Sequence, residues 1–160
     1  MSIMKYLLTA LLLSLSAGQV LACEPVELGS LEISEAWSRA SIGMTRPGAF
    51  YVTIRNTGAT DDTLTAITTP VSDKPMLHET VVKDGVASMP HAMAIPVPAG
   101  STMALEPGGY HGMLMGLTKV LKEGEIYPVT LTFREAGDVT VPVAIRGMGA
   151  RDAGCPDSKK

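Results

Sequence analysis

The chain has few of the residues on which common functional sites depend. In 160 residues it contains two cysteines, three histidines and one tryptophan. Lys and Arg number 13 against 16 Asp and Glu, and no basic stripe of the kind that binds nucleic acid is present. The sequence also lacks a G-x-S-x-G elbow, a phosphate-binding glycine loop and a convincing pair of catalytic carboxylates. The sequence therefore predicts a protein that is not an enzyme and does not bind nucleic acid.

Long apolar runs are also missing, apart from a short one near the N-terminus. The apolar run at 6–15 follows Lys5 and precedes small residues that end in Val20-Leu21-Ala22. It is too short for a membrane span, and its flanks are those of a secretory signal. We therefore predict a signal peptide over 1–22, a single domain over 23–150 and a short tail over 151–160.

The two cysteines, Cys23 and Cys155, lie at opposite ends of the predicted mature chain. In an oxidising compartment the default expectation is a disulfide that ties the termini together. Two alternatives remain open. The residues before Cys23 also resemble a lipoprotein cleavage box, which would place a lipid on Cys23 and leave Cys155 free. The cysteines could instead bind a metal, although they are far in sequence from the other candidate ligands.

The remaining chain alternates apolar and polar residues over short runs, which is the period of a β-strand. We expect an all-β fold of about eight or nine short strands in a β-sandwich with Greek-key connections, with the only tryptophan, Trp37, in its core. Asp84-Gly85 predicts a tight hairpin between two of these strands. Residues 115–121 could form a single helical turn. The expected strands cover 50–55, 64–68, 76–82, 86–89, 95–97, 102–105, 126–133 and 139–145, and the short segments 31–33 and 36–38 open the domain.

Four soft donors stand out from this background: His78, Met89, His111 and Met113. They form the pattern His-x10-Met-x21-His-x-Met, with no carboxylate or cysteine inside the donor set. Two imidazoles and two thioethers suit a soft d¹⁰ ion such as Cu(I) better than a hard cation. The pattern predicts one Cu(I) per chain, provided that the four side chains converge.

The Asp84-Gly85 hairpin makes part of that convergence testable. With a two-residue loop, Thr80 faces Met89 and His78 faces His91, so His78 and Met89 are diagonal neighbours on one face. His111 and Met113 are two residues apart and share a face if their segment is extended. The sequence does not establish that the two segments meet.

Other histidines and methionines permit different interpretations. His91 and Met93 form a second His-x-Met pair, and the hairpin register puts His91 on the face of His78, as a spare ligand or one that assists copper uptake. Single methionines in a β-sandwich usually fill gaps in the core. We assign that role to Met44, Met76, Met103 and Met148.

The four-residue pattern resembles the signature of the PCuAC family of bacterial periplasmic copper chaperones. The surroundings match as well, through Leu77-His78-Glu79-Thr80, Asp84-Gly85-Val86, Pro98-Ala99-Gly100 and the run 105–117. The similarity extends from about Ile33 to Ile145. The resemblance implies a periplasmic protein with a cupredoxin-like Greek-key β-sandwich that binds one Cu(I) through His78, Met89, His111 and Met113.

The resemblance also implies delivery of copper towards the binuclear copper centre of cytochrome c oxidase subunit II, alongside a Sco-type thiol chaperone. Some members of the family add a Cu(II) site in a C-terminal tail rich in His and Met, but residues 150–160 contain neither.

Three other functions known for β-sandwich proteins have to be weighed against this prediction. A blue-copper electron carrier needs a Cys thiolate beside its histidines, and none occurs between Cys23 and Cys155. A copper scavenging or storage protein would use the same four ligands. A metal-free adhesion or assembly domain would use the methionines only for packing.

Overall fold

The computed structural model describes residues 22–155, so the predicted signal peptide, apart from its last residue Ala22, and residues 156–160 lie outside it. The described residues form strands and loops without a helix, and no helix there could cross a membrane. The strands are β1 (Val26–Leu28), β2 (Leu31–Arg39), β3 (Gly48–Asn56), β4 (Asp62–Thr68), β5 (Ser72–Glu79), β6 (Val81–Lys83), β7 (Val86–Ser88), β8 (Ile95–Val97), β9 (Thr102–Leu105), β10 (Tyr110–Leu117), β11 (Ile126–Phe133) and β12 (Gly137–Arg146).

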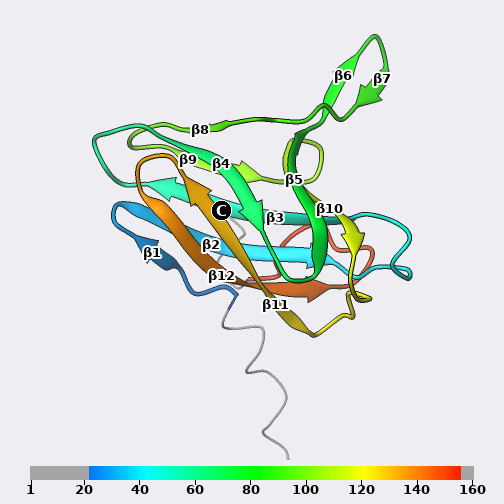
Figure 1. The fold of residues 1–160 in the computed structure, drawn as a ribbon. Helices are drawn as coiled ribbons and strands as arrows, with labels where there is room; N and C mark the ends of the chain where they lie inside the picture. The colour runs from blue at the N-terminus through cyan, green and yellow to red at the C-terminus, as the bar shows by residue number, and fades with distance from the viewer. Residues whose placement is uncertain (1–21, 156–160) are drawn as a thin grey trace, which may run out of the picture.

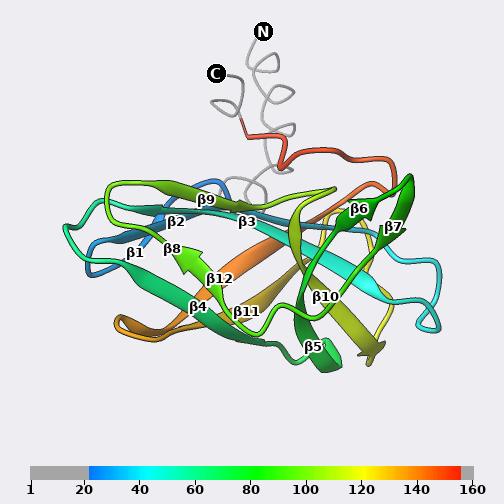
Figure 2. The ribbon, with the colours of Figure 1, turned by 90° about the horizontal axis from the view of Figure 1, so that it is seen from above.

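Ten of these strands form one curled sheet in the order β5-β10-β3-β2-β12-β11-β4-β8, to which β1 adds beside β2 and β9 beside β3. Neighbours pair antiparallel except β12 and β2, which are parallel. Seen from above, β2, β3 and β9 lie in one layer and β4 and β11 in another (Figure 2). The core fills the space between them, as in a sandwich. Strands β6 and β7 form a separate hairpin that projects from this body (Figure 1).

Alternating sequence explains why the sheet curls around one core. In β11, Tyr127, Val129, Leu131 and Phe133 are buried, while the residues between them are less so. One face of each strand is therefore apolar and is withdrawn from water by the opposite layer. This two-residue period is the signal that the sequence carries.

The all-β, cupredoxin-like class predicted from the sequence is confirmed, with more strands than expected. Strand β1 was not predicted, and β10 is a full strand where only an extended segment around His111 was expected. The helical turn proposed at 115–121 is wrong, because Met115 pairs with Lys74 and Leu117 with Ser72 across β10 and β5. Pairing with a neighbouring strand satisfies these backbone groups in place of a helix.

The two ends of the described chain are joined. Cys23 and Cys155 form a disulfide with their Cα atoms 5.6 Å apart. Beside it lies a small cluster in which Trp37 packs on Tyr51 at a ring distance of 4.6 Å, with Ala153 and Cys155 against them. Trp37 is buried as predicted, but in this cluster rather than in the main core.

Candidate metal centre

Two adjacent strands hold three of the four predicted donors, His78, His111 and Met113. Strands β5 and β10 pair antiparallel, with His78 opposite His111 and Met76 opposite Met113. Because side chains alternate along a strand, all four lie on one face of this pair. The pairing of β5 with β10 thus brings the segments of His78 and His111 together, a contact that the sequence alone did not establish.

The two imidazoles are spaced as two ligands of one ion would be. Their ring centroids are 5.9 Å apart. With metal–nitrogen distances of about 2 Å, two imidazoles on a shared ion place their centroids about 5–6 Å apart. No large movement of either strand is needed for both rings to reach one metal.

Hydrogen bonding leaves nitrogen atoms of both rings available. Nδ1 of His111 lies 3.1 Å from the carbonyl oxygen of Gly109. A carbonyl only accepts, so Nδ1 carries the proton and the Nε2 lone pair is free to bind a metal. His78 is buried, yet neither of its ring nitrogens has a hydrogen-bond partner. A buried polar group left unpaired in a native fold calls for an explanation, and metal binding provides one.

Burial also changes the pKa of His78. Removal from water lowers the pKa of His78 below that of a free histidine, and His111 and His91 nearby lower it further. The backbone of Met89 lies against the ring and opposes this shift, although no hydrogen bond forms. The net effect keeps the imidazole neutral, which is the form that binds a metal.

Gly112, between His111 and Met113, faces the core on the other side of β10. A Cβ added to it would lie 2.7 Å from Phe50 and 2.9 Å from Ile67 of the opposite layer. Only glycine lets β10 approach the core this closely. In the His-Gly-Met sequence, the two candidate donors therefore lie on one face of β10, and the close contact of Gly112 with the core lies on the other face.

Met89 lies on the segment that follows the β6–β7 hairpin. Lys83 faces Val86 across a turn in which Asp84 and Gly85 both have positive φ, as the Asp-Gly signal predicts. His78 pairs with His91, so the predicted register is confirmed. Continued by one step it sets Met89 beside Thr80, diagonal to His78, with its side chain half exposed.

Met76 is the residue that sequence reasoning missed. It was assigned to the core, but it stands directly opposite Met113 and two residues from His78, partly buried on the same face. The even spacing of Met76 and His78 was a signal of this. It becomes decisive only with the β5–β10 register, which no local pattern supplies.

The other methionines that we assigned to the core differ in their burial. Met103 is partly buried and packs against the main core, as predicted. Met44 and Met148 are 50 % and 59 % exposed, so their assignment was wrong. Both lie in loops, where no opposing layer covers them.

The thioethers matter because the other common ligands are scarce nearby. Across residues 22–155, no group of three or more His, Cys, Asp or Glu side chains is arranged to hold a metal ion. Methionine thioethers are among the donors on the face of His78 and His111, and sulfur donors of this kind suit Cu(I). The disulfide partners Cys23 and Cys155 are not available as thiolate ligands.

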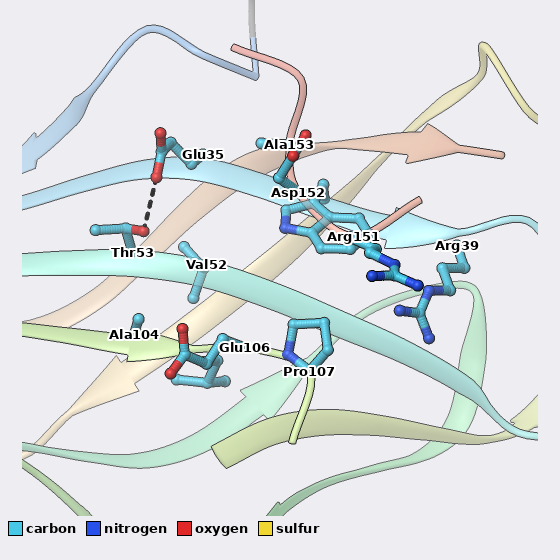
Figure 3. Close-up of a pocket in the computed structure, with 12 residues that line it drawn as sticks. Glu35, Arg39, Val52, Thr53, Ala104, Glu106, Pro107, Arg151, Asp152 and Ala153 are labelled. Carbon is cyan, nitrogen blue, oxygen red and sulfur yellow. Dashed lines mark hydrogen bonds between the residues drawn. The ribbon is translucent and has the colours of Figure 1, made fainter. Parts of the chain in front are cut away.

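A pocket of about 440 Å³ lies elsewhere, over β2, β3 and β9 (Figure 3). Its charged lining comprises the carboxylates of Glu35, Glu106 and Asp152 and the guanidinium groups of Arg39 and Arg151. Glu35 accepts a hydrogen bond of 2.9 Å from Thr53. No His, Cys or Met side chain lines this pocket, so it is separate from the candidate metal centre.

A comparison with known proteins places most of the described domain in one family. The family model described as "Putative lipoprotein LpqE-like" matches residues 31–145. The chain belongs to this LpqE-like family. A relative in Leifsonia xyli subsp. xyli (strain CTCB07), "Putative lipoprotein Lxx21020", is 39 % identical over 117 residues, covering 72 % of this chain and 68 % of its own length.

Solved structures confirm the resemblance of this LpqE-like chain to PCuAC domains. The apo PCuAC domain from PmoF1 superimposes with a TM-score of 0.67 at 26 % identity, covering 78 % of this chain and 99 % of that domain. The Cu(I) form of DR1885 from Deinococcus radiodurans gives a TM-score of 0.60 at 29 % identity, covering 76 % of this chain and 80 % of that one. The copper-bound PCuAC domain from PmoF2, 23 % identical, shares the fold with a TM-score of 0.67.

Proposed function

We propose that this LpqE-like protein is an extracytoplasmic Cu(I) carrier that binds one copper through His78, Met89, His111 and Met113. The observation that carries the proposal is the His78–His111 pair, directly opposed in β5 and β10 with its rings 5.9 Å apart. A structural relative that is 29 % identical, DR1885 from Deinococcus radiodurans, is known in a Cu(I) form, which supports this choice of ion. The donor chemistry agrees, since thioethers and imidazoles select a soft ion.

Two methionines, Met89 and Met76, are candidates for the fourth ligand of the proposed site. Met89 lies on the outer segment, where the register of the His78–His91 bridge makes it a diagonal neighbour of His78, and it is the methionine that belongs to the signature. Met76 already lies in the ladder, opposite Met113. We assign Met89 as ligand and Met76 as the wall beneath the ion, because Met89 is exposed and can move to close the site around copper or open it for release.

Carrier function follows from the ligands. Methionine binds Cu(I) without the negative charge of a thiolate, so a cysteine-bearing acceptor can take the ion by stepwise ligand exchange. We propose delivery in the periplasm, towards the binuclear copper centre of cytochrome c oxidase subunit II, directly or through a Sco-type thiol chaperone. Met89 near the surface provides a place where the acceptor's first thiolate can bind.

The first experiment measures binding and transfer. Under anaerobic reducing conditions, titration with Cu(I) against a competing chelator is expected to give one tightly bound ion per chain. Adding a reduced dithiol acceptor should then remove the ion. Failure to bind Cu(I), or failure to release it to the acceptor, would contradict the carrier role.

A second experiment separates delivery from storage. Deleting the gene is expected to lower cytochrome c oxidase activity at low copper, with restoration by added copper. Loss of copper tolerance with unchanged oxidase activity would instead indicate a scavenging or storage protein.

The state of Cys23 is tested by the mass of the exported protein. The disulfide uses the sulfur atom that a lipid would occupy, so the two states exclude each other. We propose the disulfide form, which gives no acyl mass and gains the mass of two hydrogen atoms per molecule when a dithiol reductant reduces it to two thiols. A lipid on Cys23, as the family description suggests for its members, would contradict this and leave Cys155 as a thiol.

A further inference from the structure

The segment after the hairpin carries three soft donors at two-residue spacing: Met89, His91 and Met93. Two backbone hydrogen bonds hold it against β5, from Glu79 N to Pro90 O at 3.1 Å and from Ala92 N to Leu77 O at 2.8 Å. They flank the His78–His91 pair, which makes it the closely spaced kind, with Cα atoms about 4.5 Å apart. His91 is therefore fixed directly opposite His78.

His78 stands midway between two imidazoles. Its ring centroid is 6.0 Å from that of His91 and 5.9 Å from that of His111. Both distances suit a shared ion, so geometry alone does not favour His111 over His91 as its partner. The two differ in exposure, because His111 is buried and His91 lies at the surface.

The methionines repeat the same arrangement. Met93 continues the register to the position beside Met76, just past the last hydrogen bond of the segment, and is 81 % exposed. His91-x-Met93 on one side of β5 thus mirrors His111-x-Met113 on the other. One His-x-Met pair is buried in the sheet and the other is open to solvent.

We propose that His91 and Met93 form a second, outer Cu(I) position, weaker than the first and able to exchange its ion with His78. This rests on the proposed Cu(I) function and extends it. In the exchange, copper forms a bond to a ring nitrogen of His78 as its bonds to His91 and to the sulfur of Met93 break. Copper stays monovalent throughout, so the step needs no oxidant or reductant. Because its donors are fewer and exposed, the outer position gains and loses copper more readily than the inner one.

The test counts copper ions on the exported protein. Native mass spectrometry and anaerobic chelator competition are applied to wild type, to His91→Gln/Met93→Leu and to a control with two exposed loop methionines changed, Met44→Leu/Met148→Leu. Wild type and the control are expected to bind two Cu(I), the second at least tenfold more weakly. The His91→Gln/Met93→Leu variant should bind one, with the affinity of the first ion changed less than threefold.

The outcomes separate the two proposals. Wild type that binds no Cu(I) refutes the carrier function itself. Wild type that binds one ion even in excess copper, or a His91→Gln/Met93→Leu variant that still binds two, refutes only the outer position.

A second readout follows exchange. In ¹⁵N-labelled protein, the ring nitrogens of His91 should shift when the second equivalent of Cu(I) is added and not in the control titration with Na⁺. Transfer of the first ion to a dithiol acceptor should slow at least fivefold in the His91→Gln/Met93→Leu variant. An unchanged His91 spectrum together with an unchanged transfer rate would overturn the proposal.

Discussion

The candidate metal centre joins two regions of different character. On one side, His78, His111 and Met113 belong to the long β5–β10 ladder and are buried or partly buried. On the other, Met89, His91 and Met93 lie on a segment held by an isolated bridge beneath a projecting hairpin, and all three are exposed. In the proposed Cu(I) site, the ladder would supply buried imidazoles, and the outer segment would supply side chains that are open to solvent. A carrier needs both, because it has to hold an ion and also give it up.

Removing a ladder histidine tests the fixed region most severely. His78→Ala or His111→Ala is expected to lower Cu(I) affinity by at least about 100-fold, since losing a ligand costs more than losing a residue that only supports one. Chelator competition measures the affinity, and circular dichroism checks the fold. If both variants keep wild-type affinity, the ladder does not bind the ion.

Gly112→Ala tests whether the ladder depends on its close approach to the core. The new Cβ would press on Phe50 and Ile67, so overpacking should lower the free energy of unfolding by about 1–3 kcal/mol. Urea denaturation measures this. Gly149→Ala is the matched control, because a Cβ there meets nothing within 4 Å. Equal effects at the two positions would show that the contact with the opposite layer is unimportant.

Exchanging thioethers compares the two regions directly. Met89→Leu is expected to weaken Cu(I) binding about tenfold, whereas Met76→Leu should change it less than threefold; in both, the similar volume of leucine limits the packing cost to about 1.5 kcal/mol. Chelator competition separates the two variants. A larger loss for Met76→Leu would assign the fourth ligand to the ladder and leave the outer segment without a role in the first site.

Lowering the pH is expected to give the smallest effect on stability, and the pKa of His78 determines the direction of that effect. Burial lowers the pKa of His78 in the folded state, so below about pH 6.5 the unfolded chain binds more protons at this residue than the folded chain does. Stability is therefore complete above that pH and falls as the pH drops through the lowered value. Urea titrations of the metal-free protein between pH 7.5 and 5 should show the decline, which His78→Gln should reduce. Copper affinity should fall over the same range, because protons compete for the imidazoles.

The hairpin region was predictable because its information is local. Asp84-Gly85 favours a two-residue turn, and that turn fixes the pairing of His78 with His91. Alternating residues likewise predicted most strands, for the period of two is written in short stretches such as 126–133. The family resemblance depended on the same kind of evidence, a spacing of residues inside a matching frame.

The ladder region was not predictable to the same depth. Nothing near Met76 indicates that it faces Met113, and nothing near Met44 or Met148 shows that no layer covers them. Residues 115–121 were ambiguous for the same reason, since the extension of β10 to Leu117 is stabilised by pairing with distant β5.

The sequence by itself determined the chemistry of this protein: soft nitrogen and sulfur donors, an all-β pattern and a turn that sets one register. The tertiary structure alone decided which donors meet, because the pairing of β5 with β10 depends on long-range packing around a common core. It also decided which donors are buried and which are exposed. Local residue preferences determine the conformation of each short segment, but only the closed sheet brings two distant segments within reach of one ion.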